Sequence, residues 1–463
     1  MKSHLFRGWR SGRIGHILIN MTTLYAHQTS AIQKFHDKPF GAILFECGLG
    51  KTRTALELCV KRGFRRVLVL CPVSVRTSWV EEIEKASLAI NVSIVEGMPA
   101  KKRLAIREKA HLTLMSYDSV PTMVPELLQE PWDCLICDES TKIKHFRTLR
   151  TRSIFKLSKR IPNRFILTGT PVTEHAHDIW SQFYLLSPFV LGSSFVAFRN
   201  QYCEMGGFKG KQIIGFKNLD QLIQKIHPHS ARATKEECLD LPDKIYETRS
   251  LPLSPEQRKL IKEVKKTAQT KEYAQVAGTL TTIQRITSGY DPINNTPLEQ
   301  HPKRTMLEDL LEDGVKKPLI IWVRFLEDVK LVMTILDAQG ITSKAMVGET
   351  PPSERSQIVK EFQDGTIEAL VATNVGGYGL NLQGKCQAVI FYSLWWSFES
   401  RLQAEDRVHR IGTTLPVTYI DLLCKASVDK KIYTALKKKR NFSDWVMEHL
   451  EDALEDAEEE ETV

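Results

Sequence analysis

Short, nearly continuous apolar runs recur along the chain, with stretches of helical pattern between them. In the first half they cover residues 42–45, 67–71, 112–115, 134–137 and 165–168, and in the second half residues 319–323, 343–347, 369–373, 388–392 and 417–423. Strands that lack polar alternation are typical of parallel sheets whose two faces are both covered by helices. The repeated alternation of strand and helix therefore predicts an α/β fold.

The two sets of runs are separated by residues 185–303, where Gly, Pro, aromatic and charged residues indicate loops and helices. A chain of 463 residues is also too long for a single ordinary core. We therefore predict a first α/β domain at 21–230, a helical linker or insertion at 231–300, and a second α/β domain at 301–450. Residues 1–20 resemble nothing else in the chain and are interpreted as an extension that need not be native. The acidic block 451–463 predicts a disordered tail.

The composition, with 42% hydrophobic and 26% charged residues, is that of a globular protein in water. No apolar run approaches the roughly 18–20 residues that span a bilayer, and the first residues are too basic for a signal peptide. A cytoplasmic location, in a bacterial host cell or on its nucleoid, is the resulting expectation.

Nine scattered cysteines indicate reduced thiols rather than a disulfide framework. Cys134 and Cys137 form a CxxC pattern inside an apolar run, and no second Cys or His pair follows at zinc spacing. This arrangement favours buried structural cysteines over a metal or redox site.

The formal charge of +9 is unevenly distributed along the chain. Eight of the 55 acidic residues lie in 451–463, which leaves 64 basic against 47 acidic residues, a charge of +17, for the rest. So basic a body is typical of proteins that bind polyanions, of which nucleic acid is the commonest. A solvated surface explains the same charge equally well.

A glycine-rich loop follows the first apolar run and precedes a helical stretch, which is the context of a phosphate-binding loop. It reads Gly48-Leu49-Gly50-Lys51-Thr52, although Phe45 stands where the full pattern has its first glycine. Backbone N–H groups at a helix N-terminus bind phosphates, Lys51 can neutralise them, and Thr52 can ligate Mg²⁺. A glycine-rich strand–helix turn without a ligand is the alternative.

Two adjacent carboxylates, Asp138 and Glu139, follow the apolar run at 134–137. Together with the loop upstream they predict hydrolysis of Mg²⁺-ATP. Asp138 would hold the metal, and Glu139 would orient and deprotonate the attacking water. Two acidic residues at a strand end are common on their own, so this interpretation depends on the loop.

These residues belong to an ordered series of motifs that resembles the Swi/Snf branch of superfamily-two helicase-like ATPases. In chain order the matching segments are 25–28, 46–52, 71–82, 116–117, 138–141, 167–171, 320–325, 348–362, 372–382 and 403–412. Each segment alone can occur by chance, but the ordered set is highly specific. Thr141 replaces the family's His, Thr413 its Gln, and Trp395-Trp396-Ser397 its usual Trp-Asn-Pro. These departures indicate a divergent branch, and Thr141 leaves the coupling between the domains open.

The resemblance implies two RecA-like parallel-sheet domains, helical insertions between them, and ATP with Mg²⁺ in their cleft. It implies that Gln28 reads adenine, that Gly379 belongs to the nucleotide site, and that Arg407 and Arg410 act as arginine fingers when the domains close. Exposed arginines on a helix are the alternative for that pair. Contacts to nucleic acid, independent of its sequence, are implied at Lys142, Lys144, Thr373 and Trp395.

The functional prediction is a monomeric DNA translocase that hydrolyses ATP to ADP and phosphate and is stimulated by DNA, with duplex DNA favoured. One alternative is a strand-separating or annealing helicase that acts on forks. An alternative of another class is a DNA- or protein-binding scaffold without ATPase activity, against which the intact Lys51, Asp138, Glu139 and Arg407 argue. No chromodomain, bromodomain or zinc module is evident, which favours a minimal bacterial or phage member.

Overall fold

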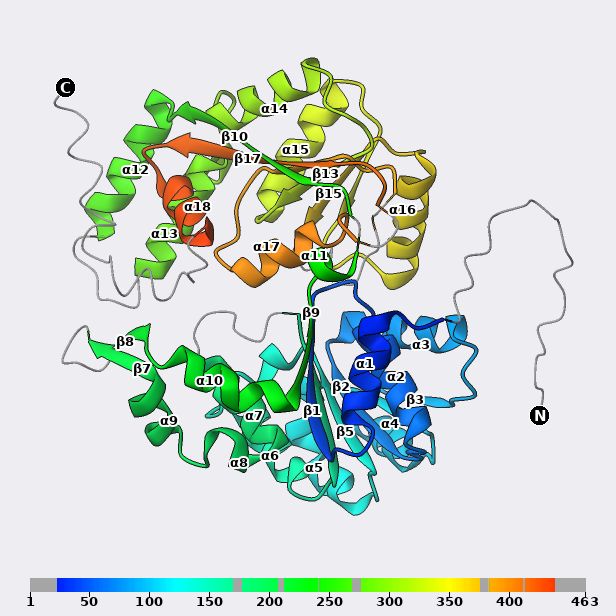
Figure 1. Ribbon diagram of the computed structural model, residues 1–463. Helices are drawn as coiled ribbons and strands as arrows, with labels where there is room; N and C mark the ends of the chain where they lie inside the picture. The colour runs from blue at the N-terminus through cyan, green and yellow to red at the C-terminus, as the bar shows by residue number, and fades with distance from the viewer. Residues whose placement is uncertain are drawn as a thin grey trace, which may run out of the picture.

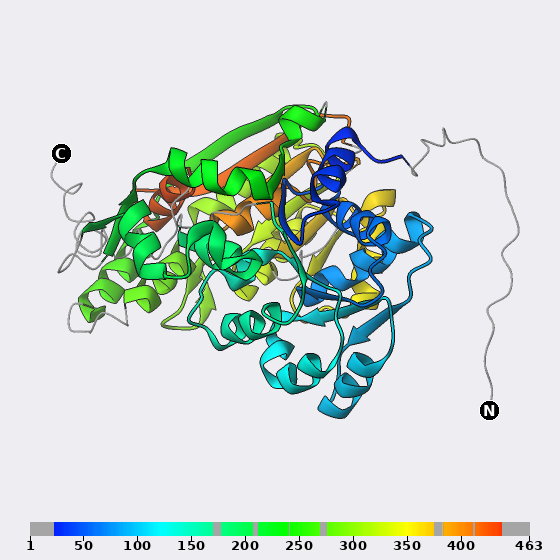
Figure 2. The same cartoon turned by 60° about the horizontal axis from the view of Figure 1, so that its bottom comes forward.

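Two parallel sheets, each with helices on both faces, form the two lobes of the computed structural model (Figures 1 and 2). The structure describes residues 23–169, 177–206, 212–239, 241–268, 276–374, 382, 384–410 and 413–437. The expected extension 1–20, the tail 451–463 and Gly379 lie outside these residues. Lobe 1 is the seven-stranded sheet with its helices, and lobe 2 is the six-stranded sheet with its own. The predicted α/β fold with two parallel-sheet units is confirmed.

Lobe 1 has the strand order β3-β4-β2-β5-β6-β1-β9, and every pair of neighbours runs parallel. The strands are β1 Phe40–Phe45, β2 Val67–Cys71, β3 Val92–Val95, β4 Leu112–Ser116, β5 Cys134–Asp138, β6 Asn163–Leu167 and β9 Ser230–Ala233. Alternate residues of β5 enter two different cores, Cys134 and Ile136 on one face and Leu135 and Cys137 on the other. Both faces are therefore buried, which explains the unbroken apolar runs.

Helices cover both faces of the lobe 1 sheet. They are α1 Ala26–Phe35, α2 Lys51–Lys61, α3 Arg76–Lys85, α4 Pro99–Arg107, α5 Val120–Gln129, α6 Leu149–Ser158 and α7 His177–Leu186. Beyond α7 the lobe carries an extra unit, with α8 Pro188–Leu191, α9 Phe195–Tyr202, the antiparallel pair β7 Cys203–Gly206 and β8 Gln212–Phe216, and α10 Leu219–Ile226. This unit projects from one side of lobe 1 (Figure 1).

Lobe 2 has the strand order β10-β17-β16-β13-β15-β14, again with parallel neighbours throughout. Its strands are β10 Lys244–Pro252, β13 Leu319–Val323, β14 Ser343–Met346, β15 Ala369–Thr373, β16 Ala388–Phe391 and β17 Val417–Lys425. Its helices are α12 Pro255–Ala268, α13 Val276–Thr287, α14 Pro302–Glu312, α15 Leu326–Ala338, α16 Pro352–Asp364, α17 Phe398–Glu405 and α18 Val428–Lys437. A short antiparallel pair, β11 Tyr290–Asp291 and β12 Thr296–Pro297, follows α13.

The region expected as a helical linker, 231–300, differs from that expectation because it supplies strands to both sheets. β9 ends in it, α11 Lys235–Cys238 bridges the lobes, and β10 pairs with β17 over nine residues. No side chain along β10 is fully buried, and five of the nine are exposed, since this strand forms the edge of its sheet. It therefore has no apolar run, and its sequence does not read as a buried strand.

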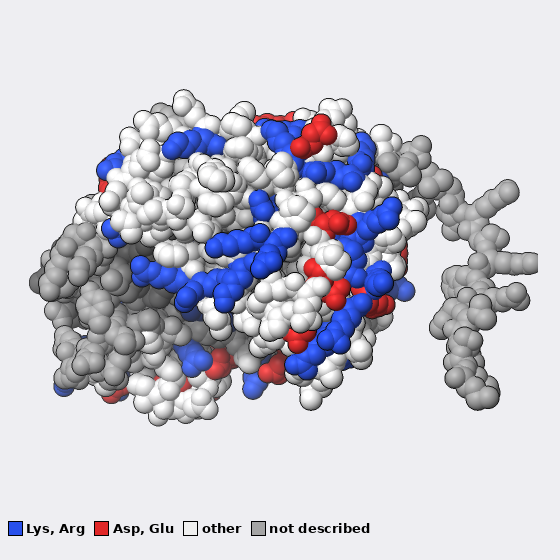
Figure 3. All heavy atoms as spheres, turned by 90° about the horizontal axis from the view of Figure 1, so that it is seen from below, with Lys and Arg blue, Asp and Glu red and all other residues white. Residues whose placement is uncertain are grey.

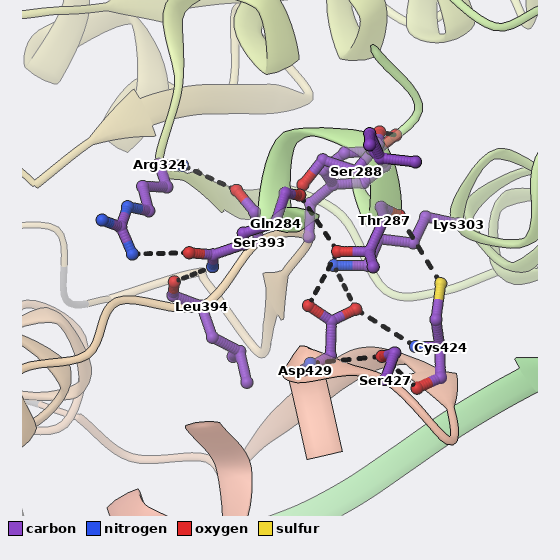
Figure 4. Close-up of polar contacts among 12 residues, drawn as sticks. Gln284, Thr287, Ser288, Lys303, Arg324, Ser393, Leu394, Cys424, Ser427 and Asp429 are labelled. Atoms are coloured by element: carbon purple, nitrogen blue, oxygen red, sulfur yellow. Dashed lines mark hydrogen bonds and ion pairs between the residues drawn. The ribbon is translucent and has the colours of Figure 1, made fainter. Parts of the chain in front are cut away.

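A buried network of polar groups fastens α13, α14 and α18 to lobe 2 (Figure 4). Lys303 Nζ lies 3.0 Å from Asp429 Oδ2, and both side chains are fully buried. Thr287 Oγ1 and the Cys424 backbone N–H also donate to the Asp429 carboxylate, each at 3.1 Å. Gln284 links α13 to the segment that follows β16, because its Nε2 donates to the Leu394 carbonyl at 2.6 Å. Among the described residues, Lys303 Nζ has no hydrogen-bond partner beyond this ion pair, so removing the Asp429 charge would leave a buried ammonium uncompensated.

Candidate nucleotide-binding and catalytic site

The glycine-rich loop runs from the end of β1 to the first residue of α2, as the sequence predicts. Gly48 and Gly50 have φ values of +89° and +74°, which L side chains rarely adopt, and Gly50 caps the N-terminus of α2. Leu49 is fully buried in the core and anchors the loop between the two glycines. Lys51 folds back over the loop, and its Nζ donates to the carbonyls of Phe45 at 2.9 Å and Glu46 at 3.4 Å. Thr52 follows in the first turn of α2.

Helix α1 supports this loop from behind through Gln28, which is only 4% exposed. Its Nε2 donates to the carbonyls of Leu49 at 3.5 Å and Gly50 at 3.4 Å, and its Oε1 accepts from the Tyr25 backbone N–H at 2.9 Å. A Cβ on Gly50 would stand 2.1 Å from that nitrogen, so the glycine is required by close approach as well. In the structure Gln28 therefore holds the loop; a contact between its amide and adenine remains a prediction.

The two carboxylates lie where β5 ends, beside the loop. Asp138 is 3% exposed, and it accepts from Trp79 Nε1 at 2.8 Å and from the Glu139 backbone N–H at 3.0 Å. Burial raises the pKa of Asp138 to about 6, and the neighbouring Glu139 charge adds to this, while Trp79 and Lys51 oppose it. Glu139 has a φ of +52°, an unusual backbone conformation for a non-glycine residue that recurs at active sites.

A third segment, at the end of β6, closes on the same loop. A Cβ on Gly169 would lie 3.2 Å from the Cys47 backbone nitrogen, 3.3 Å from the Phe45 carbonyl oxygen and 3.4 Å from Lys51 Nζ. A side chain at position 169 would therefore press against the loop and the lysine. Residues 170–171 of the same motif lie outside the described residues.

Lobe 2 contributes Arg410, which follows α17 and lies against the loop of lobe 1. A Cβ on Gly48 would stand 3.3 Å from Arg410 Cβ and 3.9 Å from its Nε. Burial lowers the pKa of Arg410, and the nearby Arg407 charge lowers it further. The loop of lobe 1 and Arg410 of lobe 2 thus lie together; the roles expected for Arg407 and Arg410 in a shared site stay predictions.

Lys235, in the short helix α11 between the lobes, contacts both halves of this site and is 7% exposed. Its backbone N–H donates to Glu46 Oε2 at 3.0 Å, while its Nζ donates to the His409 carbonyl at 2.6 Å and pairs with Asp406. The sequence identified this lysine only as part of a linker. Its role in joining the loop to the segment that carries Arg410 depends on contacts across more than 170 positions.

The predicted nucleic-acid residues fall into two groups. Lys142 and Lys144 are half-buried in and just after a 3₁₀ turn, Ser140–Ile143, that starts immediately after Glu139. Arg147, Arg152, Lys156, Lys159 and Arg160 follow on or beside α6 and are exposed. Figure 3, which looks at the molecule from below, shows Lys and Arg side chains gathered across the middle of that face, with carboxylates mostly to one side.

Thr373 and Trp395 form the second group and are each only 8% exposed. The Trp395 ring makes edge contacts with Trp322 and Phe391 inside the lobe 2 core, at centroid distances of 5.5 and 6.0 Å. This packing differs from the expectation of a DNA contact, because almost none of the ring remains for one. An apolar strand end followed by two tryptophans is compatible with a core and with a binding surface. The sequence alone therefore could not distinguish these two locations for Trp395.

Cys134 and Cys137 are fully buried in β5, as predicted, and burial raises the pKa of both thiols. Within the described ranges no cluster of three His, Cys, Asp or Glu side chains could hold a metal ion. No helix in that part of the chain is long and apolar enough to cross a membrane.

Comparison with protein families matches residues 26–297 to the SNF2-related domain and residues 302–412 to the helicase conserved C-terminal domain. The first match contains the loop, the carboxylates and the β10 strand. The second contains α17, Arg407 and Arg410.

Curated relatives of this chain include several named as helicases. An uncharacterized ATP-dependent helicase of Mycoplasma genitalium is 25% identical over 432 residues, covering 88% of this chain and 40% of the relative. A proposed ATP-dependent helicase/translocase of Bacillus subtilis is 27% identical over 449 residues, covering 88% of this chain and 47% of the relative. A further ATP-dependent helicase of Bacillus subtilis is 25% identical, and the match covers 80% of that relative. The chain thus spans less than half the length of the first relatives it matches.

Among solved structures, the SWI2/SNF2 ATPase core of Sulfolobus solfataricus in complex with double-stranded DNA matches with a TM-score of 0.45 and 24% identity. The match covers 94% of this chain and 96% of that one. More than half of the sequence matches the SNF2-related domain, with the helicase C-terminal domain following it. The chain therefore belongs to the SNF2-related family of helicase-like proteins.

Proposed function

We propose that this protein is a DNA-stimulated ATPase that uses ATP hydrolysis to move along duplex DNA. The observation that carries the proposal is the approach of Arg410, from lobe 2, to Gly48 in the phosphate loop of lobe 1. A site assembled from two lobes is complete only when they are together, so the chemistry and the movement of the lobes are linked.

The loop and α2 supply the groups that would bind the phosphates of ATP. Backbone N–H groups around Gly48 and Gly50 line the N-terminus of an 11-residue helix, and Lys51 Nζ is held beside them. Relatives named as ATP-dependent helicases support ATP as the substrate.

The residues also fit Mg²⁺, because a buried carboxylate whose pKa is raised to about 6 is stabilised by a nearby divalent cation. Asp138 and Thr52 would hold the ion, which would neutralise charge on the phosphates when bound. Trp79 and the Glu139 backbone N–H fix the orientation of the Asp138 carboxylate in advance.

Hydrolysis requires a base and a stabiliser of negative charge. Glu139 lies beside Asp138 and would accept the proton of the attacking water, a contribution of about 10²–10⁴ in rate. Arg410, with Arg407 next to it, would stabilise the charge that develops on the transferred phosphoryl group. Both arginines belong to lobe 2, so a separation of the lobes would switch the site off.

DNA is the proposed track because basic side chains follow directly after the catalytic carboxylates. Lys142 and Lys144 lie within five residues of Glu139, and further exposed cations continue along α6. Contacts of lysine and arginine with phosphates bind DNA of any sequence, as a translocating protein needs. The preference for duplex DNA is supported by the family resemblance alone.

The proposal is tested by measuring ATP turnover alone and with duplex DNA, single-stranded DNA or RNA, together with displacement of a third strand from a triplex. We expect duplex DNA to stimulate turnover most and the triplex strand to be released in the presence of ATP. Strand separation of a forked duplex would favour the helicase alternative. Equal turnover under all conditions would contradict a DNA motor, and no turnover at all would favour the scaffold.

A further inference from the structure

A hydrogen bond crosses between the lobes two residues after the catalytic base. Thr141 Oγ1 donates to Glu399 Oε1 at 3.1 Å, although the two residues are 258 positions apart. Thr141 is 4% exposed and Glu399 is half-buried. Thr141 is also one of the positions where this sequence departs from the family pattern, since it stands in place of the motif histidine.

Thr141 is fixed within lobe 1 by the turn that follows Glu139. Its carbonyl accepts from the Lys144 backbone N–H at 3.1 Å, and the Glu139 carbonyl accepts from the Lys142 backbone N–H at 3.0 Å. The adjacent Ser140 donates to Gln182 Oε1 at 2.5 Å. Because this turn is continuous with Glu139, a force on the Thr141 side chain acts on the backbone of the base.

Contacts within lobe 2 fix the helix that carries Glu399. It lies in the first turn of α17, where the Ser397 hydroxyl accepts from the Ser400 backbone N–H at 3.2 Å. Two residues on, Arg401 pairs with Asp421 of β17 and with Glu405. The helix that carries Glu399 is therefore tied to the lobe 2 sheet.

Glu399 also faces the charged groups of the proposed site. Burial raises the pKa of Glu399, and the charge of Glu139 raises it further, while Lys142, Thr141 and Lys144 oppose both effects. The Glu399 carboxylate thus interacts electrostatically with Glu139 and with the two lysines predicted to contact DNA.

We propose that Glu399 is a positioning residue that holds Thr141 from the opposite lobe and thereby sets Glu139 for proton transfer only while the lobes are together. The inference rests on the proposed ATPase function. It assigns to a threonine–glutamate pair the coupling between domains that the missing motif histidine left open.

The test compares Glu399→Ala, Thr141→Val and the double variant with the wild-type protein, in the presence of duplex DNA. Loss of one hydrogen bond to a charged group should lower kcat about tenfold to a hundredfold. The KM for ATP should change by less than about twofold, because no contact between the loop and the phosphates is removed. The double variant should be no slower than the slower single variant, since both changes break the same bond.

Two conservative variants and a control complete the experiment. Glu399→Gln keeps the hydrogen-bond acceptor and Thr141→Ser keeps the donor, so both variants should retain most of the wild-type kcat. They can be measured even if the proteins with the larger substitutions do not fold. Glu354→Ala removes an exposed carboxylate from lobe 2 and should leave kcat unchanged.

The outcomes separate this inference from the proposed function. If the wild-type protein does not hydrolyse ATP, the proposed ATPase function itself is overturned. Normal wild-type turnover with an unchanged kcat in Glu399→Ala would overturn the positioning role alone. A double variant whose loss equals the product of the two single losses would show that the residues act independently, which also contradicts the pair.

Discussion

The two lobes have similar parallel sheets but place their chemical groups by different means. In lobe 1 the loop, Asp138-Glu139 and Gly169 each follow a strand directly, and the parallel sheet brings the carboxyl ends of these strands to one edge. In lobe 2, Arg407 and Arg410 follow a short helix whose position depends on ion pairs with distant residues. The local sequence thus determines where the lobe 1 groups lie, whereas tertiary packing determines where the lobe 2 arginines lie.

This difference has a functional consequence. A strand end in a buried sheet is held by its neighbours on both sides, so the lobe 1 groups are difficult to displace separately. In lobe 2, Arg410 follows α17, and its neighbour His409 accepts a hydrogen bond from Lys235 through its backbone carbonyl. Changes far from the nucleotide should therefore impair the lobe 2 half of the site more readily than the lobe 1 half.

The largest effect should follow from removing the contribution of lobe 2 directly. Arg410→Ala should lower kcat by about 10³–10⁵, because a charge that we propose to stabilise the transition state is lost. Affinity for ATP should stay within a few fold, since the loop of lobe 1 is intact. Turnover and nucleotide binding measured in parallel check this. Arg249→Ala, at a half-exposed arginine of the same lobe, is the matched control; an equal loss there would undermine the assignment.

A somewhat smaller effect is expected when the base of lobe 1 is changed. Glu139→Gln keeps the size of the side chain and should lower kcat by about 10²–10⁴, because the amide cannot accept the proton. Binding of ATP, followed by a fluorescent analogue, should persist. Turnover near the wild-type rate would show that the base has been misassigned.

The buried pair of lobe 2 offers a test at a distance. Asp429→Asn should destabilise this lobe by about 3–5 kcal/mol, because it leaves the Lys303 ammonium buried without its partner charge. Hydrogen exchange should rise in α14 and α18 and remain unchanged in β1, β2 and β5. Replacing both residues together, as Lys303→Met with Asp429→Asn, should recover much of the stability, because the buried charge is gone and the amide oxygen still accepts from Thr287 or Cys424. Uniform loss of protection in both lobes would contradict their energetic independence.

The smallest effect concerns the pH dependence of Asp138. Its folded-state pKa of about 6 is above the usual value, so the folded protein holds more protons than the unfolded chain between about pH 4 and 6. Stability without Mg²⁺ should therefore fall as the pH rises through this window and stay lower above it. Asp138→Asn should raise the unfolding free energy at pH 7.5 by on the order of 1–2 kcal/mol and have little effect below pH 4. Activity should show the opposite trend and decline at a pH below 6, because bound Mg²⁺ stabilises the carboxylate and lowers the pKa of Asp138, and only the protonated carboxyl would release the metal.

The sequence predicted those parts of the molecule that depend on neighbouring residues. Unbroken apolar runs identified most strands of both sheets, and the segments after them identified the loop and the carboxylates. The edge strand β10 was missed because half of its side chains face solvent. Trp395 was expected at a DNA surface, and only the packing against Trp322 shows it to be part of the core.

Long-range contacts explain the remaining differences. Neither the position of Lys235 between Glu46 and Asp406 nor the bond from Thr141 to Glu399 has a local signal. The sequence could indicate only that something unusual occurs at Thr141, because a family histidine is absent there. Which residue compensates depends on the relative placement of two lobes, and that placement is a property of the folded chain.

The pairing of β10 with β17 also affects how the chain folds while it is being synthesised. β10 ends at Pro252, whereas β17, its neighbour over nine residues, begins at Val417. At about 5–20 residues per second, a ribosome would need on the order of 10–30 s to complete the partner strand. During that interval the nascent chain would expose an unpaired strand edge, which is prone to join other chains. The charged side chains Lys244, Glu247 and Arg249 along β10 would discourage such association until its partner emerges.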